Sequence, residues 1–263
     1  MTPFGYIFGA YCWLKNYLVT FIYLYLIPSL KNLGKKRDFK GSEFDLTRYG
    51  KKSIEAMGFD VELLNPHEVD LAENFVMVSN HRSWFDQIAM LASYPSGIHF
   101  LAKEEYFKIP ILGRCMKNFE MIPVTKKKLD PNANSTLNRC LKQNENVCFF
   151  MEGTRGQGRD LLSFKKGAFY HAVEHKKRVL PLYILGSERC SSKSRHLFDI
   201  RPGTITIVIG KPRVFTQDNF KAQFEEFESA YRRVHNQLYL EHEIFQSDQH
   251  LLTKLEPTTL SYT

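Results

Sequence analysis

The chain has 263 residues, of which 43% are hydrophobic and 24% are charged. This composition argues against an intrinsically disordered chain and against a protein with several membrane spans. Lys and Arg exceed Asp and Glu by 36 to 28, so the chain is basic. The length favours one large domain. The basic charge favours anionic partners, such as phospholipid head groups, acidic carrier proteins, coenzyme A or nucleic acid.

The N-terminal region 4–30 is apolar and aromatic, with Lys15 as its only charge. A cleavable signal peptide is not expected, because the start is not basic and no small-x-small cleavage site follows. The charge-free run 17–30 is shorter than the about 20 residues that a membrane-spanning helix needs. Taken together with the residues before Lys15, the region fits one tilted span or two short helices in one leaflet. Its aromatic side chains suit the head-group boundary; they are Tyr6, Tyr11, Trp13, Tyr17, Tyr23 and Tyr25.

A basic cluster follows this apolar region and is expected to face the cytoplasm and attract anionic lipid. Its members are Lys31, Lys35, Lys36, Arg37 and Lys40. A buried hairpin with a solvated basic loop is the alternative. We predict a membrane-associated helical segment with a basic flank at 1–40, the main domain at 41–245 and a poorly ordered polar tail at 246–263.

Short apolar runs alternate with helix-length segments through the main domain, and several runs are too uniformly apolar to be half exposed. The predicted strands are 75–79, 98–102, 121–124, 147–150, 179–185 and 204–209. The predicted helices are 46–57, 84–94, 104–117, 134–143, 163–174 and an amphipathic helix over 220–238. The alternation predicts an α/β fold whose sheet is mainly parallel and is covered by helices.

The five cysteines show no CxxC pair and no spacing typical of metal ligands, which favours a reducing compartment and gives no reason to expect a metal. They are Cys12, Cys115, Cys140, Cys148 and Cys190. Cys140 and Cys148 are expected to be small buried residues. His99, His171 and His175 have no partner by spacing and are expected to be structural or exposed.

His81 and Asp86 follow the first strand of the main domain, in the segment NHRSWFD at 80–86. Positions five apart on a helix do not face each other, but these two side chains can meet if His81 lies in the loop and Asp86 in the first helical turn. The carboxylate would then orient the imidazole as a general base. No GxSxG segment is present, so the attacking hydroxyl would belong to the substrate. Taken alone, the pair is better explained as a surface histidine and an aspartate at a helix N-terminus.

A second polar segment, FMEGTR at 150–155, follows another apolar strand. Gly156 and Gly158 come next, and backbone N–H groups at glycines can approach an anion closely. Arg155 can hold a phosphate through two parallel hydrogen bonds. The segment lacks the Lys-Ser/Thr pair of a Walker A loop, so nucleotide hydrolysis is not predicted.

Together these segments resemble the glycerolipid acyltransferase family of HxxxxD type, which includes lysophosphatidic acid acyltransferases. The resemblance covers about 75–212, and its blocks occur in the family's order. They are NHRSWFD at 80–86, a middle block from Leu101-Ala102-Lys103 through Pro110 and Gly113 to 121–126, FMEGTR at 150–155 and VLPL at 179–182.

The resemblance implies that His81 is the general base and that Asp86 orients it. It also implies a group of residues that bind the phosphate of the acceptor: Lys103, Lys126, Glu152, Gly153, Thr154 and Arg155. The chain departs from the family at three places. A glycine commonly stands where Glu120 does, an acidic or amide residue and then Arg where Thr125-Lys126 stands, and a proline where Met151 stands. Lys126 keeps the positive charge of the family's arginine but cannot form the two parallel hydrogen bonds that a guanidinium forms with a phosphate. The departures therefore concern the choice of acceptor.

The expected activity is transfer of a fatty-acyl group from acyl-coenzyme A or acyl carrier protein to a lysophospholipid, above all 1-acyl-glycerol-3-phosphate. Neither a cofactor nor a metal is expected. Backbone N–H groups near Trp84 are candidates for stabilising the oxyanion. The expected partners are the acceptor, the thioester donor, which includes acyl carrier protein, and an anionic membrane (the inner membrane in a bacterium). Nucleic acid is not expected, because no recognition module is present. The rivals are an acyltransferase or transacylase for another lyso-lipid and a non-catalytic membrane-binding adaptor.

Overall fold

The computed structural model describes residues 3–27, 39–110, 112–118, 120–125 and 131–247. The basic side chains predicted at 31–37, Lys126 and the tail from residue 248 lie outside these residues.

Seven strands form one sheet in the order β1-β7-β6-β2-β5-β3-β4. Their bounds are β1 Phe59–Leu64, β2 Val76–Ser79, β3 Ile98–Lys103, β4 Ile122–Val124, β5 Asn146–Phe150, β6 Val179–Leu185 and β7 Gly203–Ile209. The strands β6, β2, β5, β3 and β4 are mutually parallel, whereas β7 is antiparallel to β6 and parallel to β1. The predicted α/β class with a mainly parallel sheet is therefore confirmed.

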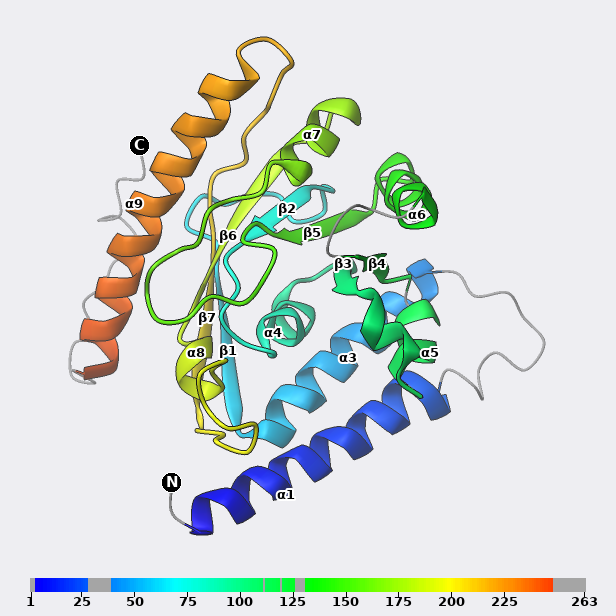
Figure 1. The fold of residues 1–263 in the computed structure, drawn as a ribbon, viewed down its shortest axis with the longest axis vertical. Helices are drawn as coiled ribbons and strands as arrows, with labels where there is room; N and C mark the ends of the chain where they lie inside the picture. The colour runs from blue at the N-terminus through cyan, green and yellow to red at the C-terminus, as the bar shows by residue number, and fades with distance from the viewer. Residues whose placement is uncertain (1–2, 28–38, 111, 119, 126–130, 248–263) are drawn as a thin grey trace.

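Helices cover both faces of the sheet (Figure 1). Their bounds are α1 Pro3–Thr20, η1 Phe21–Leu26, α3 Phe39–Met57, α4 Asp86–Ser93, η2 Glu104–Lys108, α5 Leu112–Asn118, α6 Pro131–Lys142, α7 Gly167–Glu174, α8 Ser187–Cys190 and α9 Phe220–Ser247. The helices α1, α3 and α4 pack on one another beside the sheet, while α6, α7 and α9 contact it from the other side.

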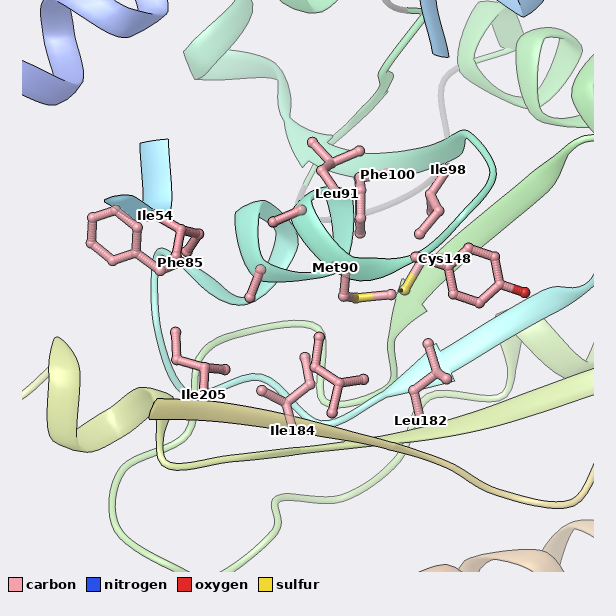
Figure 2. Close-up of a cluster of buried hydrophobic side chains, with 14 of the residues drawn as sticks. Ile54, Phe85, Met90, Leu91, Ile98, Phe100, Cys148, Leu182, Ile184 and Ile205 are labelled. Atoms are coloured by element: carbon pink, nitrogen blue, oxygen red, sulfur yellow. Dashed lines mark hydrogen bonds between the residues drawn. The ribbon is translucent and has the colours of Figure 1, made fainter. Parts of the chain in front are cut away.

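Two hydrophobic cores separate these layers, one on each face of the sheet. Along β2, Val76 and Val78 join the core beneath α7 and α9, while Met77 joins the core beneath α4. Figure 2 shows the core beneath α4, in which Met90 of α4 lies against Cys148 of β5. Side chains alternate along a strand, so a strand covered on both faces must be apolar at nearly every position. This explains the uniform apolar runs in the sequence.

The structure differs from the sequence prediction at two elements, for local reasons. The helix predicted over 104–117 is divided into η2 and α5, with Ile109 in an extended conformation just before Pro110. Proline disfavours the helical conformation in the residue before it, which ends the first helix there. The strand β1 was not predicted, because its alternating burial marks a half-exposed edge strand with a weak apolar signal.

The helix α1 packs on α3 through a buried polar contact. The Ser53 hydroxyl donates to Asn16 Oδ1 at 2.9 Å, so Asn16 serves packing within the protein. Trp13 was predicted at the head-group boundary, but it is only partly exposed and packs against the core beneath α4. Its indole N–H donates to the Leu197 carbonyl at 2.8 Å. Among the described residues, no helix is both long enough and apolar enough to cross a membrane.

Candidate active site

The predicted site residues come together because parallel strands end at the same edge of the sheet. The strands β2 and β5 pair directly, with Ser79 opposite Phe150, so the segments that begin at Asn80 and Met151 leave the sheet side by side. Lys103 is exposed at the end of β3, at this same edge. In open α/β sheets, ligands bind outside the carboxyl ends of the strands.

His81 and Asp86 are in direct contact. The imidazole Nδ1 lies 2.7 Å from Asp86 Oδ2, and His81 lies in the loop while Asp86 begins α4, as the sequence predicted. The Asp86 carboxylate is fully buried, whereas the His81 side chain is 16% exposed. The carboxylate therefore holds the proton on Nδ1 and leaves Nε2 as the nitrogen that can accept a proton from a substrate.

Asp86 also holds the turn that carries His81. Its Oδ2 accepts hydrogen bonds from the backbone N–H of Arg82 at 2.7 Å and of Ser83 at 2.9 Å. Three donors thus converge on one oxygen, which fixes the loop against the first turn of α4. These two N–H groups were among the candidates for an oxyanion site near Trp84. Because Asp86 occupies them, they do not serve that purpose in this structure.

The ring of Phe150 packs against one face of the His81 imidazole. The two rings stack with their centroids 4.0 Å apart and their planes 18° from parallel. Phe150 is the last residue of β5, and its own ring stacks on Phe100 of β3. The imidazole is therefore held by a hydrogen bond at one edge and an aromatic surface on one face, which restricts its rotation.

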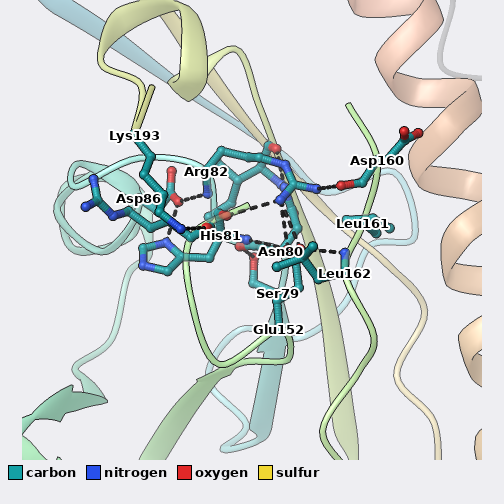
Figure 3. A network of polar contacts seen from close by, with 12 residues as sticks. Ser79, Asn80, His81, Arg82, Asp86, Glu152, Asp160, Leu161, Leu162 and Lys193 are labelled. Atoms are coloured by element: carbon teal, nitrogen blue, oxygen red, sulfur yellow. Dashed lines mark hydrogen bonds and ion pairs between the residues drawn. The ribbon is translucent and has the colours of Figure 1, made fainter. Parts of the chain in front are cut away.

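Glu152 forms a buried ion pair with Arg82 and does not face open solvent (Figure 3). The Arg82 Nη1 donates to both carboxylate oxygens, at 3.1 and 3.0 Å, and both side chains are at most 1% exposed. The backbone N–H groups of His81 and Leu162 also donate to this carboxylate, at 3.2 and 2.8 Å. Glu152 was expected to bind the acceptor's phosphate, but its contacts are those of a residue that positions the His81 loop.

Two glycines make this packing possible. Gly153 has a φ of +66°, in the left-handed region that disfavours side chains. At Gly156 a Cβ would lie only 1.7 Å from Arg82 Nη1. The Gly156 N–H donates to the His81 carbonyl at 2.8 Å. The glycine-rich segment thus closes over Arg82 and ties the two polar segments together.

Arg155 lies over Trp84, in the segment that carries His81 and Asp86, and is partly desolvated. Its guanidinium lies 4.1 Å from the centre of the Trp84 ring, and burial lowers the pKa of Arg155 from its usual value without neutralising it. Lys193, which the sequence did not single out, donates to the Arg155 carbonyl at 3.1 Å. Thr154 is exposed beside it. A guanidinium held over an aromatic ring is suited to bind an anionic group.

Sequence reasoning also missed Tyr231, which anchors the site from α9. Its hydroxyl accepts from the Asn80 backbone N–H at 3.0 Å and donates to the Leu182 carbonyl at 2.7 Å. The Asn80 side chain in turn pairs with the backbone of Ile184 at 2.8 Å in both directions. The apolar periodicity of α9 identified Tyr231 as a packing residue, but its polar contact joins positions 151 residues apart and had no local signal.

Comparison with known proteins finds relatives of both the sequence and the fold. Residues 60–185 match the model of a family described as acyltransferase. A chloroplast 1-acyl-sn-glycerol-3-phosphate acyltransferase of Arabidopsis thaliana is 36% identical over 141 residues, which cover 52% of this chain and 38% of that protein. A 1-acyl-sn-glycerol-3-phosphate acyltransferase of Bacillus subtilis is 28% identical over 162 residues, covering 61% of this chain and 77% of that protein.

Residues 60–185 of the chain are therefore similar to the acyltransferase family. The crystal structure of the 1-acyl-sn-glycerophosphate acyltransferase PlsC of Thermotoga maritima superposes with a TM-score of 0.64 at 24% identity, over 86% of this chain and 97% of that one. That likeness confirms the fold. The chain spans 38%, 40% and 51% of the length of the first three curated relatives.

The acyltransferase match extends from β1 to β6, so it contains both polar segments of the site. It leaves α1, α3, β7 and α9 outside, although Tyr231 of α9 completes the site. None of the described residues of this candidate site belongs to a group of side chains that could together hold a metal ion.

Proposed function

We propose that the chain is an O-acyltransferase that moves a fatty-acyl group from a thioester to the free hydroxyl of a lysophospholipid. The observation that carries the proposal is the contact between His81 and the buried Asp86, which leaves Nε2 of the imidazole at the open edge of the sheet. The favoured acceptor is 1-acyl-glycerol-3-phosphate, because the curated relatives carry that activity in their names. The donor is acyl-coenzyme A or acyl carrier protein.

His81 would act as the general base. As the acceptor hydroxyl attacks the thioester carbonyl, its proton passes to Nε2, and Asp86 stabilises the imidazolium that forms. The tetrahedral intermediate then collapses, the C–S bond breaks, and the proton on Nε2 neutralises the departing thiolate. The products are the diacyl lipid and the free thiol of the donor. The scheme uses no cofactor and no metal ion.

Product analysis tests this function and separates it from its rivals. Purified protein should be incubated with a panel of lysophospholipids and with acyl-coenzyme A or acyl carrier protein, and the products measured by mass spectrometry. We expect phosphatidic acid from 1-acyl-glycerol-3-phosphate. Equal transfer without a thioester would indicate a transacylase, a different preferred acceptor would indicate another lyso-lipid acyltransferase, and no transfer would indicate a membrane-binding adaptor.

Arg155 is proposed to bind the phosphate of the acceptor, together with Lys103, Thr154 and Lys126. Substituting Arg155→Ala should raise KM for a phosphorylated acceptor by about 10- to 100-fold, because a charge-assisted hydrogen bond is lost. Arg155→Lys is the matched control. It keeps the positive charge but loses the paired N–H donors of the guanidinium, so it should raise KM less than Arg155→Ala does. Steady-state kinetics should be measured with this acceptor and with a monoacylglycerol, which has no phosphate. Equal loss with both acceptors would contradict a phosphate role.

We also propose that α1 binds the surface of an anionic membrane and holds the domain on its cytoplasmic side. Five of its exposed apolar side chains recur at steps of three and four and so form one continuous face. They are Phe4, Ile7, Tyr11, Leu14 and Leu18. Such a face buries apolar surface when it lies in the interface, and the formal net charge of +8 favours anionic lipid.

The double substitution Ile7→Glu and Leu14→Glu should therefore weaken sedimentation with vesicles that contain an anionic phospholipid by about 10-fold or more. Leu240→Glu is the control, since Leu240 is an exposed apolar residue on α9. Unchanged sedimentation of the double variant, or an equal loss in the control, would contradict binding through α1.

A further inference from the structure

A second cluster of polar side chains lies away from the proposed active site, where α6 meets the sheet. Its members are His99 of β3, Glu120 in the turn before β4, Cys140 of α6 and Glu145 just before β5. Each contributes a possible metal ligand, and the four ligand atoms lie within 4.8 Å of one another. His99 pairs with Val147, three residues before Phe150, so the cluster is about 10 Å along the sheet from the end of β5.

His99 has the geometry of a metal-binding histidine. The side chain is fully buried, and its Nδ1 lies 3.1 Å from the Glu120 carbonyl oxygen. A carbonyl oxygen can only accept a hydrogen bond, so Nδ1 must carry a proton. Its Nε2 lies 3.0 Å from Glu145 Oε2, inside the cluster. Histidines that bind metals commonly donate their other ring N–H to a carbonyl in this way, which fixes the ring and the tautomer.

Glu120 adopts a backbone conformation that is costly for any residue with a side chain. Its φ is +51°, in the left-handed region where an L-residue is disfavoured by about 1–2 kcal/mol. This explains why a glycine commonly stands here in the family. The present chain instead places a carboxylate at this position and directs it into the cluster. Strain of this kind is typically retained at functional sites.

The charges around the cluster suit a divalent cation. A thiolate at Cys140 and carboxylates at Glu120 and Glu145 would supply three negative charges. Arg139 supplies one positive charge, with Nη2 2.8 Å from Glu120 Oε2 and 3.9 Å from Cys140 Sγ. Together with Arg139, a divalent ion would therefore balance the three negative charges. Metal binding must displace the thiol proton of the buried Cys140, as it does when thiols coordinate zinc. It must also displace the proton that lies between His99 Nε2 and Glu145 Oε2, which are 3.0 Å apart.

We propose that His99, Glu120, Cys140 and Glu145 bind a divalent ion of the zinc class. One nitrogen, one sulfur and two carboxylate oxygens are ligands that zinc prefers. Tetrahedral zinc requires ligand atoms about 3.4–3.8 Å apart, so a shift of about 1 Å at the side chains would complete the site. The ion would join β3, β5, α6 and the turn before the edge strand β4, and thus stabilise that side of the domain. The proposal does not depend on the proposed function.

Cobalt titration of the purified, chelator-treated full chain tests the proposal, because cobalt replaces zinc and reports its ligands. We expect one equivalent of Co²⁺ to produce visible bands of a tetrahedral site and a near-ultraviolet band from thiolate ligation. Zinc should remove these bands and raise the Tm. A second group of possible ligands, His171, Glu174 and His175 on α7, provides a matched control; His171→Gln should leave the thiolate band unchanged.

Two variants assign the ligands. Cys140→Ala should abolish the thiolate band. Glu120→Gly should relieve backbone strain, so it should fold at least as stably without metal while it binds cobalt about 10-fold or more weakly. The proposal is overturned if the wild type shows no thiolate band, if the band persists in Cys140→Ala, or if Glu120→Gly binds cobalt as tightly as the wild type. Visible cobalt bands that come without a thiolate band and are lost in His171→Gln would place the ion on α7 and would also overturn it.

Discussion

Replacing His81 with alanine is expected to lower kcat for acyl transfer by about 100- to 10,000-fold, the usual contribution of a general base. Because Phe150 packs against the imidazole and Asp86 is already satisfied by two backbone N–H groups, the loop should keep its shape when the ring is removed. Transfer from a labelled thioester to 1-acyl-glycerol-3-phosphate measures the effect. Circular dichroism should show an unchanged fold.

Asp86→Asn provides a second test of the same pair. It removes the charge that stabilises the imidazolium, while its amide oxygen can still accept hydrogen bonds from the N–H groups of Arg82 and Ser83. Activity should fall with a modest loss of stability. His175→Ala, outside the site, is the control for replacing a histidine. Undiminished transfer by the His81→Ala variant would rule out the mechanism.

Removing the charge of Glu152 is expected to cost about 3–5 kcal/mol of the free energy of unfolding, since it leaves the Arg82 guanidinium buried without its partner. Glu152→Gln is the conservative substitution, and urea denaturation measures the cost. Glu55→Gln is the matched control, because Glu55 pairs with Lys52 on the exposed surface. The control should leave the stability unchanged, since exposed ion pairs contribute little.

The same variant separates two roles for Glu152. If it positions the His81 loop, kcat should fall together with stability, because the carboxylate holds the His81 backbone N–H. If it binds the acceptor directly, KM for the acceptor should rise while stability is kept. The second result would restore the role that the resemblance implied.

The sequence was sufficient for features that depend on neighbouring residues. The apolar runs predicted six of the seven strands, because a strand covered on both faces shows its burial at every position. The sequence also allowed the contact between His81 and Asp86, on the condition that His81 lies in the loop and Asp86 in the first helical turn, and the structure meets that condition. Helix ends were less predictable, as Pro110 shows, since a single residue changed the local geometry.

Only the tertiary structure decided features that join distant parts of the chain. The reversed direction of β1 and β7, the anchoring of Asn80 by Tyr231 and the pairing of Arg82 with Glu152 all depend on contacts between residues far apart in sequence. The same is true of the cluster around His99. A polar residue in a sequence motif can bind a substrate or satisfy another buried charge, and the two roles have the same local pattern. Burial and partners distinguish them, and both are set by how the layers pack.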